Sequence, residues 1–126
     1  MGLHDPSIEA LYATGHWLLT AERFADAAVV FRTMALAAPS DERAWLALGT
    51  CHEGIGQPEL ATTLYGIAEA VAPPAIRCTI ARGRAMRTLG SEDEAKLSFE
   101  RALDLAVERG DDELASLAEL ELRAAS

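Results

Sequence analysis

The sequence predicts an all-α fold: a right-handed α-solenoid of three helical hairpins that ends in one further helix. Three observations support this prediction. Equivalent residues recur every thirty-four positions, a period that is typical of stacked helical hairpins. Half of the 126 residues are apolar but only 6% are aromatic, which favours helices that pack closely through small side chains. Residues that start and end helices also fall where the repeat requires them.

The repeat is visible as columns of equivalent residues. These columns are Gly15, Gly49 and Gly83; Ala27, Ala61 and Ala95; Phe31, Tyr65 and Phe99; and Met34, Ala68 and Ala102. A glycine within a helix costs about 1 kcal/mol relative to alanine, so close packing must compensate for it. We expect each glycine to face the alanine column, which lets two backbones approach, and the aromatic column to fill the gap to the next repeat.

Local signals set the expected helix bounds. The helices should span residues 8–20, 24–37, 42–54, 58–71, 76–88 and 92–108, which gives repeats of about 8–41, 42–75 and 76–109 in a single domain of residues 1–126. Asp41 suits the start of the third helix, and Pro58 suits the first turn of the fourth. Ser91 and Glu94 have the spacing of a capping box at the start of the sixth.

A seventh helix is expected near residues 111–124. It begins at two aspartates, whose carboxylates suit the positive end of a helix. Its apolar residues are Leu114, Leu117, Leu120 and Leu122. We expect these leucines to cover the last repeat, as the closing helix of a solenoid does.

The columns resemble the tetratricopeptide (TPR) repeat. The second repeat carries the pattern almost completely, with Trp45, Leu48, Gly49, Gly56, Ala61, Tyr65, Ala68 and Pro73. The first repeat departs from it at the turn position, where Glu22 stands in place of glycine, and the third repeat has Thr79, Arg82 and Val107 where Trp, Leu and Pro are expected. The resemblance implies that the first helix of each pair lines a concave peptide-binding groove. The groove positions are Glu9, Tyr12, His16, Leu19, Arg43, Leu46, Thr50, Glu53, Arg77, Ile80, Arg84 and Arg87.

The chemistry of these positions indicates the kind of ligand. Tyr12, Leu46 and Ile80 form an apolar line, one residue per repeat, and three arginines stand at the third-repeat end. Lysine and asparagine, which a TPR protein needs to clamp the acidic C-terminus of a heat-shock chaperone, are absent from these positions. We therefore expect an extended peptide with spaced apolar anchors. Three anchors at about 1.5–3 kcal/mol each, less about 2–5 kcal/mol for ordering the ligand, predict modest affinity.

Longer stretches are similar to the class II chaperones of bacterial type III secretion. They are residues 24–31, 41–49 and 56–61, with Leu11-Tyr12 before them and Gly90 and Glu94-Ala95 after them. The resemblance implies a small cytoplasmic protein that holds an extended segment of a hydrophobic secreted translocator before export, with Tyr12 in the groove. Family members usually have a longer N-terminal extension that often makes a dimer contact, and here seven residues precede the first repeat, so a homodimer is left open. The alternative is a TPR adaptor or scaffold in another bacterial assembly.

Composition argues against several other classes. Eleven basic against twenty acidic residues give a net charge of -9, which would repel nucleic acid and anionic membranes. No stretch approaches the roughly 18 apolar residues of a membrane span, and the start lacks the pattern of a signal peptide. We therefore expect a cytoplasmic protein with no nucleic-acid partner and no membrane insertion.

Catalysis, metals and cofactors are not indicated. Cys51 and Cys78 lie far apart without metal-ligand spacing, so two reduced, partly buried thiols are expected. His52-Glu53 lacks the second histidine of a zinc-protease motif, and no nucleophile and base can be paired from the sequence. The chain is therefore predicted to be a non-catalytic binding protein without cofactor or metal.

Overall fold

The chain folds into α-helices joined by short turns. The structure is a computed structural model that describes residues 5–124. These residues form the helices α1 (Pro6–Thr20), α2 (Phe24–Ala37), α3 (Glu42–Gly54), α4 (Pro58–Val71), α5 (Ile76–Thr88), α6 (Glu92–Arg109) and α7 (Asp112–Ala124). No strand occurs among them, and each helix begins and ends within two residues of its predicted bounds. The predicted all-α fold is confirmed.

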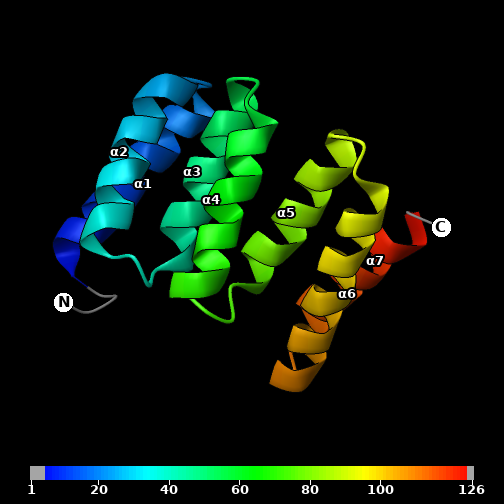
Figure 1. The fold of residues 1–126 in the computed structure, drawn as a ribbon. Helices are drawn as coiled ribbons and strands as arrows, with labels where there is room; N and C mark the ends of the chain where they lie inside the picture. Colours follow the sequence, from blue (N-terminus) through cyan, green and yellow to red (C-terminus); the bar gives the residue numbers. More distant parts are fainter. Residues whose placement is uncertain (1–4, 125–126) are drawn as a thin grey trace.

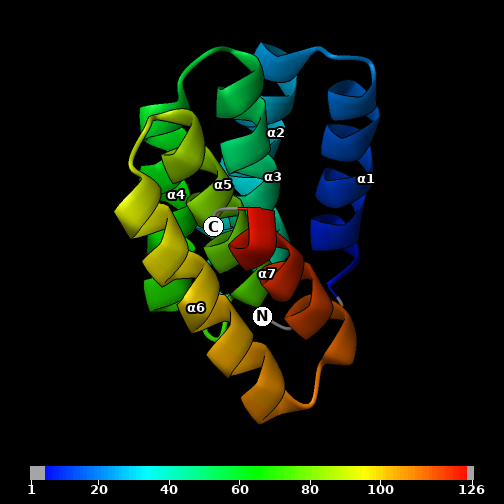
Figure 2. The ribbon, with the colours of Figure 1, turned by 90° about the vertical axis from the view of Figure 1, so that its right-hand side faces the viewer.

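The helices form three hairpins, α1/α2, α3/α4 and α5/α6, that stack side by side (Figure 1). The first helices of the hairpins contact one another, α1 with α3 and α3 with α5, whereas within residues 5–124 the second helices make no such contacts with each other. The first helices therefore lie closer together and form the inner, concave side of the stack. α7 packs against α6 and also reaches α5 (Figure 2).

The column of buried glycines makes room for the column of aromatic rings. A Cβ atom built on Gly15 would lie 2.6 Å from the ring of Phe31, and the equivalent atoms on Gly49 and Gly83 would collide with Tyr65 and Phe99. All three rings are completely buried. The expectation that glycine faces alanine is therefore wrong, because the nearest atoms belong to the ring of the same repeat. Each ring packs against the glycine of its own hairpin, and Phe31 and Tyr65 also pack with residues of the following hairpin, as expected of the aromatic column.

The turns inside the repeats share one backbone conformation. Gly56 and Gly90 have φ angles of 88° and 83°, and Glu22 at the equivalent position of the first repeat has a φ of 58°. This left-handed conformation costs a residue with a Cβ atom about 1–2 kcal/mol, whereas glycine adopts it freely. The first repeat thus adopts the turn of the other two without the residue that favours it.

Replacing Glu22 with glycine is expected to stabilise the protein. The strain at the left-handed turn is removed, and part of the gain is offset by the greater freedom of glycine in the unfolded chain. We expect the free energy of unfolding to rise by about 0.5–1 kcal/mol, measured by urea denaturation. Glu22→Ala is the control, since it removes the same charge but keeps the Cβ atom. Equal effects of the two substitutions would show that the turn is not strained.

The helix starts differ in how they are capped. The Asp41 carboxylate accepts a hydrogen bond from the Arg43 amide at 3.1 Å, and Pro58 lies in the first turn of α4, as predicted. The predicted capping box at Ser91 does not form, because its side chain makes no capping bond. The Ser91 amide that Glu94 would have bound instead donates to the Met86 carbonyl at 2.9 Å. The Ser91 amide is thus bonded to the end of α5 and is not available to the Glu94 side chain at the start of α6.

Both cysteines are free and buried, as expected. Cys51 packs in the cluster formed by the first two hairpins, and Cys78 packs with Tyr65 between the second and third. Burial raises the pKa of the Cys51 thiol to about 11, so this group stays protonated at neutral pH. No helix within residues 5–124 is long and apolar enough to cross a membrane.

Candidate functional site

The concave side carries a hollow of about 390 Å³. It is lined by Tyr12, His16, Leu19, Arg43, Leu46, Ala47, Thr50 and Arg77. All of these except Ala47 stand at groove positions named from the sequence. They come from α1, α3 and the first turn of α5, so three consecutive hairpins contribute to one surface. We call this surface the groove.

Helical spacing brings the groove residues together. Tyr12, His16 and Leu19 are separated by four and three positions, which places them on one face of α1. The Tyr12 ring centroid lies 5.9 Å from that of His16 and 6.2 Å from that of the buried Phe31. Tyr12 and Leu19 are half-buried and His16 is exposed. The tyrosine ring is therefore held by packing beneath it while one side faces the groove.

Arg43 is fixed in the groove wall by two carboxylates. Its guanidinium contacts Glu9 at 2.8 Å and Asp41 at 2.7 Å, and its Cζ atom lies 4.6 Å from the centroid of the Tyr12 ring. The hydrogen bonds that Arg43 donates to Asp41 and then to Glu9 raise the pKa of Arg43 above its ordinary value. The Arg43 charge is thus neutralised within the protein, and its side chain supports the tyrosine.

The polar residues at the far edge of α3 are also engaged. The Tyr65 hydroxyl donates to the Glu53 carboxylate at 2.8 Å, and burial together with this bond raises the pKa of Tyr65 above its ordinary value. Glu53, although predicted at a groove position, does not line the hollow. The Thr50 hydroxyl donates to the Leu46 carbonyl at 2.9 Å.

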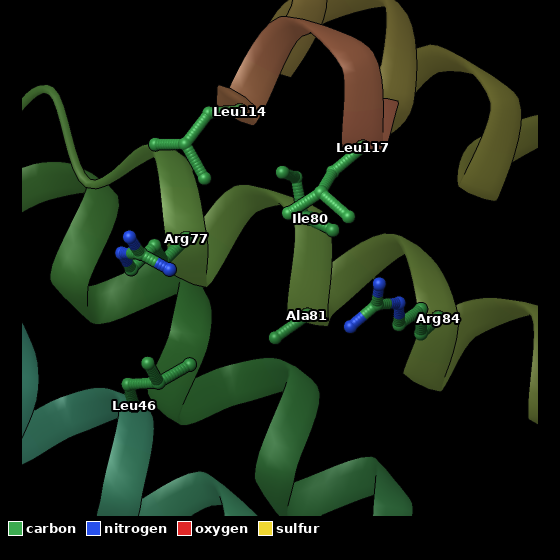
Figure 3. A pocket seen from close by; sticks show the side chains of 7 residues that line it. All are labelled: Leu46, Arg77, Ile80, Ala81, Arg84, Leu114 and Leu117. Carbon is green, nitrogen blue, oxygen red and sulfur yellow. The ribbon is translucent and has the colours of Figure 1, made fainter. Parts of the chain in front are cut away.

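The third-repeat end of the groove is covered by α7. Ile80 is only 3% exposed and belongs to the cluster that contains Leu114 of α7. A smaller hollow of about 120 Å³ remains there (Figure 3). It is lined by Leu46, Arg77, Ile80, Ala81, Arg84, Leu114 and Leu117. The expectation that Ile80 is presented on an open surface is not met, because α7 buries its own apolar face against it.

Two of the predicted groove arginines hold α7 in place. The Arg84 Nε atom lies 2.6 Å from the Glu121 carboxylate, and Arg87 donates to the Glu121 main-chain oxygen at 3.1 Å. Leu117 and Leu122 pack against the cluster of the last hairpin. Leu120 was expected to cover the last repeat as well, but it is 56% exposed because it lies on the outer face of α7.

The apolar surface continues around α1 beyond the predicted positions. A second hollow, of about 470 Å³, is lined by Tyr12, Ala13, His16, Trp17 and Thr20. Trp17 is 64% exposed, and the sequence analysis did not single it out. The signal in the sequence that could have indicated Trp17 is a large aromatic residue that belongs to none of the repeat's core columns. Tyr12 and His16 line both hollows and therefore connect them.

Comparisons with known proteins find solved structures only. No protein-family model matches the chain, and no curated protein matches its sequence. PcrH, a protein of Pseudomonas aeruginosa, was solved with the chaperone binding region of PopD; it is 28% identical, with a TM-score of 0.84 over 98% of this chain and 94% of PcrH. Because this identity extends over nearly the full length of both chains, the similarity includes the groove helices.

Two further structures share the fold. The Yersinia enterocolitica type III secretion chaperone SycD, solved with a peptide of the translocator YopD, is 23% identical, with a TM-score of 0.82 over 99% of this chain and 96% of SycD. The first TPR of Spaghetti (RPAP3), bound to an HSP90 peptide, is 22% identical, with a TM-score of 0.78 over 98% of this chain and 95% of that chain. The predicted TPR architecture is thereby confirmed.

Proposed function

We propose that this chain, which has the fold of the type III secretion translocator chaperones, binds an extended apolar segment of a translocator protein and holds it before export. One observation carries the proposal. The groove on α1, α3 and α5 belongs to a chain that is 28% identical over 98% of its length to PcrH, which was solved with the chaperone binding region of PopD. The resemblance inferred from the sequence thus has a structural counterpart.

The groove chemistry supports an extended peptide as the ligand. Tyr12, Leu19 and Leu46 offer half-buried apolar surface on two neighbouring helices. An extended chain exposes side chains on alternating sides and can place apolar residues on this surface. Its backbone amides need acceptors, and the Thr50 oxygen and the His16 ring are polar groups within the same hollow. The client is therefore bound by apolar anchors and oriented by a few polar contacts.

The burial of Ile80 changes the expected affinity. Of the three predicted anchors, Tyr12 and Leu46 remain open. At about 1.5–3 kcal/mol each, the binding free energy from these two anchors barely exceeds the roughly 2–5 kcal/mol needed to order a flexible client. Stable binding therefore requires additional contact area between the client and the protein. The surface around Trp17, which continues from Tyr12, supplies such area on the same face of the protein.

The proposal includes binding without catalysis, in the cytoplasm. Arg43, in the groove wall, is paired with Glu9 and Asp41. The Cys51 thiol is buried and protonated. What remains in the groove is an apolar surface with few polar groups, which suits a binding partner that must leave again at export.

Affinity capture from the native host tests the proposal. The tagged protein is recovered under secretion-inducing conditions, and the retained chains are identified by mass spectrometry. We expect a hydrophobic exported protein to dominate, and a synthetic peptide from that protein to bind the purified chain with one-to-one stoichiometry by calorimetry. Capture of soluble assembly components alone would overturn the chaperone proposal in favour of a TPR adaptor.

A further inference from the structure

The groove contains one arginine, Arg77, that has no ion-pair partner among residues 5–124. We propose that the client segment presents a single acidic side chain, flanked by apolar residues, to Arg77, and that this pairing selects the client. The inference rests on the proposed function, because it specifies the peptide that the groove holds. It concerns a specificity-determining contact and adds no chemical step.

The other groove arginines already have ion-pair partners inside the protein. Arg43 pairs with Glu9 and Asp41, while Arg84 and Arg87 lie at 2.6 and 3.6 Å from the carboxylate of Glu121. The guanidinium of Arg77 has no carboxylate within ion-pair distance among residues 5–124. Within the described residues, Arg77 is therefore the groove arginine whose guanidinium is available to a carboxylate from outside the protein.

Arg77 also stands where a bound peptide must pass. Arg77 lines both the hollow beside Tyr12 and the smaller hollow against α7. Leu46 also lines both hollows. Figure 3 shows the Arg77 side chain between Leu46 below and Leu114 of α7 above, with Ala81 lying towards Arg84. Arg77 is exposed, and the smaller hollow beside it is lined mainly by apolar residues together with Arg84. A client that follows the groove from α1 towards α7 covers Arg77.

An acidic residue of the neighbouring helix α3 bonds to the main chain beside Arg77. Glu42 stands at the start of α3, and its carboxylate accepts a hydrogen bond from the Cys78 amide at 3.0 Å. This bond ties Glu42 to the first turn of α5 through the main chain. Among the described residues Glu42 forms no ion pair with the Arg77 side chain.

Covering Arg77 has consequences for which peptides bind. A charge that loses water without gaining a partner is penalised, whereas a charge-assisted hydrogen bond to a carboxylate compensates for the lost hydration. Peptides without an acid at this point are thus disfavoured. The net charge of -9 repels acidic polypeptides as a whole, so the matching feature is one acid between apolar residues and not an acidic run.

Selection from a random library of displayed twelve-residue peptides tests the inference. The immobilised proteins are the wild type, Arg77→Glu and Arg32→Glu. Arg32 is an exposed residue of α2, away from the groove, so its variant carries the same change in net charge. Circular dichroism establishes that all three are folded. Because displayed peptides continue into the coat protein, none offers a free terminal carboxylate, and selection reports on side chains alone.

We expect the wild type and Arg32→Glu to enrich peptides that carry Asp or Glu between apolar residues, by roughly tenfold over the same peptides with Lys. Arg77→Glu should abolish this preference or reverse it to Lys and Arg. Enrichment of apolar peptides with no acidic preference, or with the same preference in Arg77→Glu, would overturn the inference and leave the groove assignment intact. Failure of the wild type to enrich any apolar peptide would overturn the proposed function together with it.

Discussion

A protein that carries Tyr12→Ala and Leu46→Glu together is expected to lose capture of its client while keeping its helix content. Tyr12 and Leu46 provide apolar surface on α1 and α3. Removing one anchor forfeits about 1.5–3 kcal/mol, and the glutamate additionally requires a carboxylate to lose water against apolar client residues. The combined loss corresponds to at least about a hundredfold in affinity.

Titration of a labelled client peptide measures this loss, and circular dichroism measures the fold. The matched control is Leu36→Glu, which makes the same chemical change at a residue of α2 that is 81% exposed and lines none of the hollows described above. Because Tyr12 also packs near Phe31, Leu46→Glu alone serves as a second variant with an undisturbed tyrosine. A folded double variant that retains the client at the wild-type level would refute the groove assignment.

Gly49→Ala is expected to produce the largest loss of stability from a single methyl group. The added Cβ atom would collide with the ring of Tyr65, which is completely buried and donates to Glu53 at 2.8 Å. The ring cannot move without disturbing its cluster or this hydrogen bond. Overpacking of this kind costs about 1–3 kcal/mol or more, and it outweighs the gain of about 1 kcal/mol from replacing a helical glycine.

Gly66→Ala is the matched control, because Gly66 also lies within a helix but its nearest neighbouring atom would be the Arg82 Nε at 3.7 Å, an ordinary contact. We expect Gly66→Ala to raise the free energy of unfolding by about 0.5–1 kcal/mol. Urea denaturation of both variants, and of Gly49→Ala combined with Tyr65→Leu, measures the effect. Two results would contradict the role assigned to the ring. One is a similar change in the free energy of unfolding for Gly49→Ala and Gly66→Ala, and the other is a cost of Gly49→Ala that Tyr65→Leu does not reduce.

The groove could be predicted to a large extent from the repeat. Once the helices are placed, their spacing fixes which residues face inward, and the hollow beside Tyr12 is lined almost entirely by positions named in advance. Trp17 was missed because it stands outside the repeat's columns. The pairing of Arg43 with Glu9 was also missed, although the two residues are separated by one repeat length, because the exact reach of two long side chains depends on how closely α1 and α3 approach.

The sequence by itself determined the helices, their bounds and the inner face of each hairpin, because these follow from periodic patterns that act within a few turns. Only the tertiary structure decided that α7 covers Ile80, that Glu121 engages Arg84 and Arg87, and that Arg77 has no ion-pair partner within residues 5–124. The physical reason is that a local pattern shows which face of a helix is apolar but does not show what covers it. Which element covers the face depends on how the hairpins stack, because the stacking places the end of the groove within reach of the last helix.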